Sequence, residues 1–485
     1  MTAKRLLALA QEREAIAQGR MTPFLPNSTR YLSKKENSGR HNPAPTEWRE
    51  RMENSLIVRI GLVVVAILLC VSSAAWALTQ QEKLAFKVEL GELLYFDEYL
   101  SKNKNQSCAS CHFPEPGFVD LENVDDPAFS VVSLGSDPTL NGGRNAPSVA
   151  YAAFSPAFYW NEEEELYMGG QFWDGRAATL TEQAKGPFLN PVEMAMESPA
   201  AVLTEMVDKK NPNAKTYKKL FEKVYGFDLS NLNLKNQMKV EAAYEMVAEA
   251  IAAFEKTAYF RPFTSKYDYY LAGAAALSAQ ELRGLALFNG KAQCNLCHPA
   301  DLVEDDAGNP IGPPLFTDYS YDNLGIPKST NPLIADNPVD YGLGGRPDIA
   351  AVDEDPELTA AAGYPVSAGE AGKFKVMTLR NIAVTAPYGH NGFFATLEQT
   401  VRFYNRRDQM QSMSGGGGMG GGGMGGGGGG MGMNMQPEVA QNVNTDELGN
   451  LGLTMMEEGD LVAFLRTLTD GYGAAFPYDF PPPSP

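Results

Sequence analysis

Residues 106–112 read Gln-Ser-Cys-Ala-Ser-Cys-His, and a second Cys-x-x-Cys-His stretch occupies residues 294–298. In a helical turn, cysteines three residues apart point to the same side of the backbone. Both thiols can then form thioether bonds with the two vinyl groups of one haem, while the adjoining histidine ligates the iron. The sequence therefore predicts two haem c groups, attached at Cys108, Cys111 and His112 and at Cys294, Cys297 and His298.

A zinc site and a redox dithiol are the alternatives for such motifs. Zinc ribbons place their paired Cys-x-x-Cys motifs about 15 to 20 residues apart, whereas these two motifs lie far apart in the chain. A thioredoxin-like dithiol does not require a neighbouring histidine. The chain contains only 4 histidines, and one directly follows each cysteine pair. Haem attachment explains this coincidence best.

Composition describes an ordinary globular protein with an acidic surface. The 485 residues are 44% hydrophobic and 20% charged, which is enough for two or three domains with real cores. The net charge of −19 argues against binding to nucleic acid. Four cysteines belong to the haem motifs and the fifth, Cys70, lies in an apolar run, so the sequence offers no disulfide framework.

The first 77 residues comprise a polar extension and an apolar run. Residues 1–54 contain no motif that we connect with chemistry, and they need not belong to the mature protein. Residues 55–77 are mostly apolar and end in Ala75-Trp-Ala77, an A-x-A cleavage signature. This pattern favours a cleaved signal peptide and export to the periplasm. A retained membrane anchor is the alternative.

A degenerate internal repeat predicts the fold class. Thr79-Gln-Gln-Glu82 and Ser278-Ala-Gln-Glu281 are capping boxes that begin amphipathic helices, and each helix leads to a haem motif. Each copy resembles a cytochrome c-like helical domain. We therefore expect a mainly α protein with long ordered loops and two haem domains, covering residues 78–265 and 266–470.

Other segments have simpler interpretations. Residues 239–254 are alanine-rich with helical spacing, and Thr454-Met-Met-Glu457 is a capping box that predicts the last helix. Residues 301–372 predict a long ordered loop. Residues 413–435 are nearly all Gly with scattered Met and predict a disordered insertion, with copper(I) binding as the less favoured reading. Residues 471–485 form a Pro-rich tail.

Several further motifs resemble the bacterial di-haem cytochrome c peroxidases and their MauG relatives. The similarity extends in order from about Leu84 to Leu468. Its motifs are Phe172-Trp-Asp-Gly-Arg-Ala177, Glu182-Gln-Ala-Lys-Gly-Pro187, Asn190-Pro-Val-Glu-Met194, Leu379-Arg-Asn381 and Thr385-Ala-Pro-Tyr-Gly-His-Asn-Gly392. They agree with the family in spacing as well as in residue type.

The resemblance implies roles for individual residues. Glu193 and Gln183 match the pair above the peroxide-binding, N-terminal haem, where a carboxyl group can move a proton between the two oxygens of peroxide. Trp173 matches the tryptophan between the haems, with an ordinary core tryptophan as the alternative. Asn145 and the carbonyl groups of Thr385 and Pro387 match a calcium site, and oxygen donors suit that ion.

Two departures from the peroxidases bear on mechanism. Many family members hold a histidine in the loop before Arg-Asn-Ala-Pro that caps the peroxide haem, but residues 133–143 contain none. The peroxide haem should therefore be open at rest. Tyr404 stands where the peroxidases place a methionine ligand of the second haem. MauG-type enzymes have a tyrosine at this position. An anionic oxygen ligand would lower the haem potential, and core packing is the alternative role for Tyr404.

These features predict a periplasmic peroxidase that reduces hydrogen peroxide at the His112 haem. Electrons would come from a small c-type cytochrome or a cupredoxin, through the His298 haem and Trp173. One alternative is a MauG-like enzyme that oxidises side chains of a partner protein. Another is a di-haem electron carrier without catalysis. The sequence leaves open both the identity of the donor and whether the protein is a homodimer.

Overall fold

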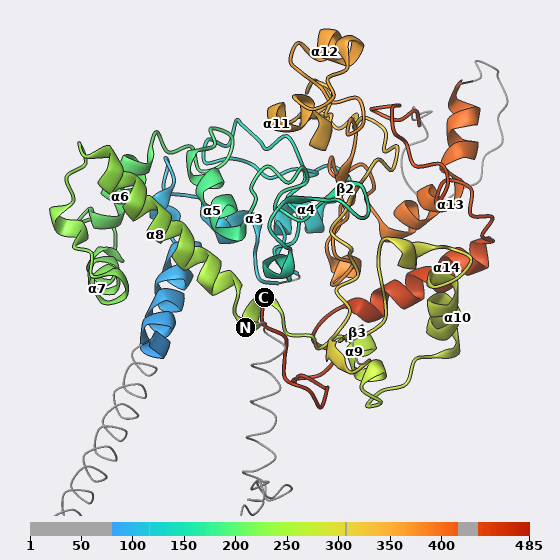
Figure 1. The fold of residues 1–485 in the computed structure, drawn as a ribbon, viewed down its shortest axis with the longest axis horizontal. Coiled ribbons are helices and arrows are strands. Elements are labelled where there is room, and N and C mark those ends of the chain that lie inside the picture. Colours follow the sequence, from blue (N-terminus) through green and yellow to red (C-terminus); the bar gives the residue numbers. More distant parts are fainter. Residues whose placement is uncertain (1–79, 116, 306–307, 416–434) are drawn as a thin grey trace, which may run out of the picture. The chain divides into compact units, whose positions relative to one another are not determined.

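The computed structural model describes residues 80–485 apart from 116, 306–307 and 416–434 (Figure 1). The predicted extension over 1–54 and the predicted signal peptide or anchor over 55–77 lie outside the described residues. Within the described ranges, no helix is both long enough and apolar enough to cross a membrane. These ranges belong to one compact unit, Trp76–Pro485.

Helices are the main regular structure of the described residues, as the sequence predicts, and the strands form only short antiparallel pairs. The first helix covers residues 80–95. The following α-helices are α3 (Cys108–Cys111), α4 (Leu121–Asp125), α5 (Leu180–Leu189), α6 (Pro199–Val207), α7 (Ala214–Tyr225), α8 (Gln237–Glu255), α9 (Lys266–Leu271), α10 (Ala279–Phe288), α11 (Pro347–Ala350), α12 (Pro356–Ala362), α13 (Leu397–Gly415) and α14 (Met455–Leu465). The strand pairs are β1 (Tyr159–Asn161) with β2 (Leu166–Met168), β3 (Val303–Glu304) with β4 (Pro310–Gly312), and β5 (Tyr321–Asp322) with β6 (Phe374–Lys375).

In the first half of the described chain, a glycine allows the first helix to pack closely against α8. The side chain of Asn236 caps α8 by accepting a hydrogen bond from the backbone N–H of Lys239. A Cβ atom on Gly91 would overlap the main-chain oxygen of Ala250 in α8. Any larger residue at position 91 would therefore push the two helices apart, and with them the haem motif that follows.

The second half repeats this packing between α10 and α14. Both helices begin with the predicted capping boxes, at Ser278 and at Thr454. Gly284 of α10 lies so close to α14 that a Cβ atom would overlap the main-chain oxygen of Asp460. In each half, the helix that precedes the Cys-x-x-Cys-His motif thus crosses a later helix at a glycine.

The largest buried apolar clusters lie on the two sides of the predicted domain boundary. One runs in sequence from Leu90 to Phe263 and the other from Tyr267 to Leu468. The two sides are joined by contacts described below. The division into domains at 78–265 and 266–470 stays a prediction.

Two expectations about loops need correction. The predicted loop over residues 301–372 also contains α11 and α12, each of which begins with a proline at its first position. Proline suits that position because the first helical N–H has no partner within the helix. The predicted insertion over 413–435 falls mostly outside the described residues. Because α13 continues to Gly415, the helix includes the start of that segment.

The Pro-rich tail over 471–485 packs back on the protein. The hydroxyl group of Tyr478 donates a hydrogen bond to Asp268 at 3.0 Å. Asp268 also accepts two hydrogen bonds from the guanidinium of Arg380, at 3.0 and 2.9 Å, and both side chains are fully buried. Removing either member of this pair would leave the other as an unpaired buried charge, which typically costs about 3 to 5 kcal/mol.

Candidate haem and catalytic sites

The first Cys-x-x-Cys-His motif forms a short helix whose two cysteines face one cavity. The backbone N–H of Ser107 donates to the hydroxyl oxygen of Ser110 at 3.0 Å, which fixes the start of α3. The hydroxyl group of Tyr95 donates to the main-chain oxygen of His112 at 2.7 Å and ties the end of the motif to the first helix. The cavity, of about 440 Å³, is lined by Cys108, Cys111 and His112. We call it the N-terminal cavity.

The second motif follows α10 and lines a second cavity, of about 250 Å³. We call this the C-terminal cavity, and Cys294, Cys297 and His298 all line it. Nδ1 of His298 lies 2.7 Å from the main-chain oxygen of Phe316. If Nδ1 carries the proton, Nε2 keeps its lone pair for a metal.

The donor set in each cavity fits a covalently bound haem. Each cavity brings together two thiols and one imidazole from a single motif. Burial lowers the pKa of His112 to about 4 and also lowers the pKa of His298, so that both imidazoles are neutral at pH 7. Neutral imidazole is the form that ligates iron.

Glu193 and Gln183, two of the three residues predicted to act in catalysis, line the N-terminal cavity with His112. Gln183 lies on α5, and Glu193 follows that helix in a loop. The side-chain amide of Asn190 donates to a carboxylate oxygen of Glu193 at 2.7 Å, which orients the group. Burial raises the pKa of Glu193, while the charge of Arg176 and this hydrogen bond oppose the shift. A partly buried carboxyl group held by a hydrogen bond can take up a proton from one bound group and pass it to another.

The loop over residues 133–143, which contains no histidine, forms part of the wall of the N-terminal cavity. Ser133 and Leu134 line the N-terminal cavity, and the backbone N–H of Ser136 donates to the main-chain oxygen of Glu193 at 2.7 Å. Among the histidines in the described ranges, only His112 lines this cavity. His390 lies instead in the C-terminal cavity, stacked on Phe374 with ring centroids 3.7 Å apart.

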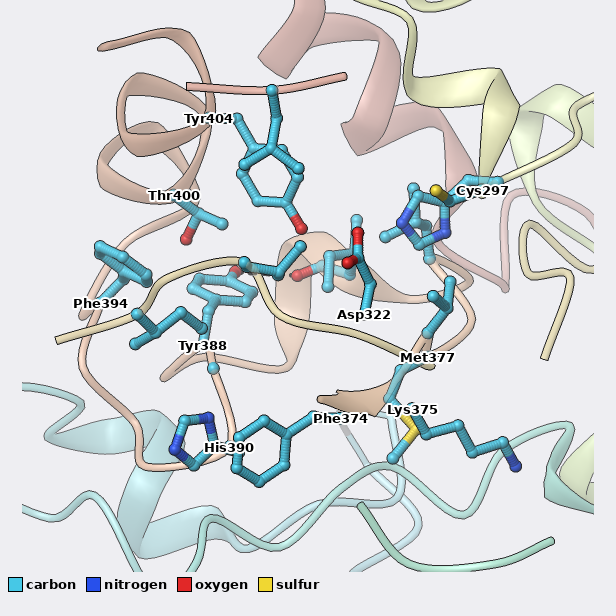
Figure 2. Close-up of a pocket in the computed structure, with 18 of the residues that line it drawn as sticks. Cys297, Asp322, Phe374, Lys375, Met377, Tyr388, His390, Phe394, Thr400 and Tyr404 are labelled. Carbon is cyan, nitrogen blue, oxygen red and sulfur yellow. Dashed lines mark hydrogen bonds between the residues drawn. The ribbon is translucent and has the colours of Figure 1, made fainter. Parts of the chain in front are cut away.

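Tyr404 extends from α13 into the C-terminal cavity, with Cys297 across the same space (Figure 2). Burial raises the pKa of the Tyr404 phenol well above its usual range, and the nearby sulfur of Cys297 adds to this shift. A phenol in this place could supply an oxygen ligand to iron. Asp322 and Glu447 lie beside Cys297, and the side-chain amide of Asn444 donates to both carboxylates at 2.7 Å.

Trp173 belongs to a wall that the two cavities share. Its main-chain oxygen accepts a hydrogen bond from the backbone N–H of Lys375 at 2.8 Å. Two segments from different halves of the chain, 145–148 and 375–378, also line both cavities. We call Trp173 with these two segments the shared wall.

Two buried ionisable groups of this region escaped the sequence analysis. Lys375 lies in the shared wall, where burial lowers its pKa to about 7 and its ammonium group donates to the main-chain oxygen of Gly170 and the hydroxyl of Ser155. Glu255 at the end of α8 lines the N-terminal cavity, and burial raises its pKa to about 8. In the sequence, only the position of Lys375 between the apolar residues Phe374 and Val376 indicates that it is buried. The Ala-Phe-Glu run that ends in Glu255 gives no such indication.

The three residues predicted to bind calcium line the C-terminal cavity together. The backbone N–H of Asn145 donates to the main-chain oxygen of His390 at 2.8 Å, and its side-chain amide donates to Val131 at 3.1 Å. The bond to His390 holds Asn145 close to the segment that contains Thr385 and Pro387. Calcium binding by these residues stays a prediction.

Several known proteins are similar to this chain in sequence or in structure. A family model described as di-haem cytochrome c peroxidase matches residues 85–276. Methylamine utilization protein MauG of Paracoccus denitrificans is 37% identical over 392 residues, which cover 79% of this chain and 88% of that protein. Cytochrome c551 peroxidase of Nitrosomonas europaea is 33% identical, over 66% of this chain and 72% of that protein. The crystal structure of the diheme peroxidase BthA from Burkholderia thailandensis matches with a TM-score of 0.61 and 29% identity, over 79% of this chain and 86% of that one.

Proposed function

Since the chain belongs to the family of di-haem cytochrome c peroxidases and MauG, we propose that it reduces hydrogen peroxide in the N-terminal cavity. The observation that carries this proposal is the convergence of Glu193, Gln183 and His112 on one cavity. The haem of the first motif, when bound, supplies an iron that takes up peroxide and exchanges electrons with it. We place the enzyme in the periplasm, with two cytochrome c-like haem domains.

The side chains of this cavity have separate tasks in the reaction. Glu193 would take a proton from one oxygen of peroxide and deliver it to the other, which can then leave as water. Asn190 holds the Glu193 carboxyl group in place through their hydrogen bond. Gln183 orients the bound peroxide by hydrogen bonding. The loop over 133–143 holds no histidine, so it would offer no imidazole to compete with peroxide for a haem bound in this cavity.

Electrons reach this cavity from the C-terminal one in the same proposal. Trp173 lines both cavities, so an electron can pass through its indole between the two sites. Tyr404 would ligate the second iron and stabilise its oxidised forms. Calcium bound at Asn145, Thr385 and Pro387 would fix the shared wall. The donor would be a small c-type cytochrome or a cupredoxin.

A MauG-like activity is the second candidate, and two observations favour it. Tyr404 occupies the C-terminal cavity, and the loop over 133–143 supplies no histidine to the N-terminal one. In this version, the oxidising equivalents from peroxide are used on side chains of a partner protein. The two candidates share the same peroxide chemistry and differ in what is oxidised afterwards.

Replacing Glu193 by Gln tests the shared step. The variant should bind both haems with normal spectra, yet react with peroxide about a hundredfold more slowly, the usual scale for loss of an acid-base group. Glu197→Gln, a change of the same kind at an exposed position, is the matched control. Stopped-flow mixing of the ferric protein with peroxide measures both rates. Equal rates for the two variants would remove Glu193 from the mechanism.

Steady-state measurements separate the two candidates. A peroxidase should oxidise a reduced small c-type cytochrome continuously when peroxide is present. A MauG-like enzyme should oxidise such donors slowly and modify a partner protein covalently. A protein with two low-spin ferric haems and no reaction with peroxide would instead be an electron carrier.

A further inference from the structure

The β1–β2 hairpin carries an indole at the protein surface. In this pair Trp160 lies opposite Tyr167. The side chain of Trp160 is 41% exposed, while its ring packs on Tyr167 with centroids 4.8 Å apart. An exposed indole is thus in contact with a phenol at the surface of the hairpin.

Behind Trp160, a series of aromatic rings runs inward. Tyr167 stacks on Phe158 with centroids 5.3 Å apart and nearly parallel planes. Phe158 in turn contacts Tyr321 edge to face, at 5.9 Å. Tyr321 is 6% exposed, so the series begins in solvent and ends in the interior.

The inner end of this series reaches the haem cavities. Tyr321 pairs with Lys375 across β5 and β6, and Lys375 belongs to the shared wall. The next residue, Asp322, lines the C-terminal cavity. The hydroxyl of Tyr321 also lies against Gly175, two residues beyond Trp173. An electron that arrives at Tyr321 is therefore close to both cavities.

The tip of the hairpin is strongly acidic. Residues 162–165 are four consecutive glutamates, and all of them are exposed. The turn is held by Asn161, whose side-chain oxygen accepts a hydrogen bond from the backbone N–H of Glu163 at 3.0 Å. This concentration of negative charge beside Trp160 favours a positively charged partner surface.

We propose that Trp160 is a surface redox residue that takes electrons from a positively charged partner protein and passes them inward through Tyr167 and Tyr321, with Phe158 as a bridge. This inference rests on the proposed function, because peroxide supplies the oxidant. Trp160 gives one electron inward and releases its indole proton to solvent. One electron from the partner protein and one proton from water then return Trp160 to its reduced form. Two such transfers and two protons convert one peroxide into two waters.

Mass spectrometry after exposure to peroxide locates the oxidised residue. The ferric di-haem protein is mixed with a few equivalents of peroxide and a spin trap, without any electron donor, and then digested. We expect trap adducts or oxygen addition on Trp160, and their loss in Trp160→Phe. Tyr159→Phe is the matched control, because Tyr159 is the exposed neighbour of Trp160 on the same strand.

Turnover with a reduced basic c-type cytochrome tests the partner. Trp160→Phe should lower this turnover roughly tenfold or more, while the reaction of the ferric protein with peroxide keeps its wild-type rate. Replacing Glu162, Glu163 and Glu164 together by Gln should raise KM for the cytochrome with little change in kcat. Added salt should narrow the difference between this variant and the wild type, because the attraction is screened.

The outcomes separate this inference from the proposed function. If the ferric protein fails to react with peroxide, both are overturned. A normal reaction with peroxide, combined with an unmodified Trp160 or with wild-type turnover in Trp160→Phe, overturns the role of Trp160 alone. An equal loss of turnover in Tyr159→Phe would show that the hairpin acts only by its shape, and would also overturn it.

Discussion

The indole Nε1 of Trp173 donates a hydrogen bond to the main-chain oxygen of Asn145, at 2.9 Å. A residue proposed to carry electrons is thereby fixed by a residue proposed to bind calcium. The position of the indole thus depends on whether the Asn145 segment is held in place. This dependence leads to the first prediction.

Removal of calcium should disturb electron transfer more than haem binding. Treatment with a chelator should slow electron transfer between the haems, because Asn145 would lose an anchor and Trp173 would shift with it. The covalent haem content should stay the same. Pulse radiolysis or stopped-flow reduction measures the rate, and added calcium should restore it. Asn145→Ala should reproduce the effect without chelator, and a variant with unchanged rates would speak against a calcium site here.

Replacing Cys294 and Cys297 together by Ala should leave one covalent haem. The C-terminal cavity would lose its thioether bonds, and the half that surrounds it should fold poorly because the haem would form much of its core. Intact mass and the alkaline pyridine spectrum count the haems. The reciprocal change at Cys108 and Cys111 should also leave one haem. Two covalent haems in either variant would contradict the assigned attachment sites.

The fully oxidised protein should react with peroxide without prior reduction. The loop over 133–143 contains no histidine that could ligate a haem on the first motif, and Gln183 and Glu193 would bind ferric haem only weakly. Stopped-flow mixing of the ferric protein with peroxide measures this directly. A reaction that begins only after a reductant is added would contradict the prediction of an open site.

Tyr404→Met should preserve the reaction with peroxide but shorten the life of the oxidised state that follows. An anionic oxygen ligand stabilises oxidised iron better than a thioether does. Tyr404→Phe separates ligation from packing, since it keeps the ring and loses only the oxygen. If Tyr404 only fills space, Phe should behave like the wild type. Rapid-scan absorbance of the decay distinguishes these results.

Glu255 should make the protein less stable as the pH rises. Burial raises the pKa of Glu255 from an ordinary value near 4.5 to about 8, so the folded protein binds a proton that the unfolded chain has lost between these limits. Stability should therefore fall from pH 4.5 to pH 8, by up to about 1.4 kcal/mol for each pH unit. Glu255→Gln should remove this slope and leave the variant more stable than the wild type at pH 8.

Thermal unfolding of the holoprotein from pH 5 to pH 8.5 measures this effect. Glu241→Gln, at an exposed position of the same helix, provides the control and should follow the wild type. Parallel stability curves for the wild type and Glu255→Gln would show that the carboxyl group of Glu255 ionises as it does in the unfolded chain.

Local sequence patterns predicted those features whose causes are local. The capping boxes at Ser278 and Thr454 depend on residues three apart, and both are present in the structure. The contacts of Gly91 and Gly284 could not be read in this way, because each partner helix lies more than a hundred residues further along the chain. The helices α11 and α12 could not be predicted from composition, because Pro, Asp and Gly are as common in loops as at the start of short helices.

The residues of the candidate site likewise fall into those that the sequence predicted and those that it did not. Spacing alone predicted six residues for haem attachment, and the resemblance to a known family pointed to Glu193, Gln183 and Trp173. Lys375 and Glu255 were missed because charged residues are usually exposed, and only the tertiary structure shows that these two are buried. Their environment comes from segments that are distant in sequence.

The shared wall has a consequence for how the protein matures. Segment 375–378, from the second half of the chain, lines the N-terminal cavity, and segment 145–148, from the first half, lines the C-terminal one. A fragment that stops at residue 265 would have a complete attachment motif but would lack one side of its own cavity. Haem could thus be joined to the first motif before the second half has folded, but its shielding from water must wait until that half is in place.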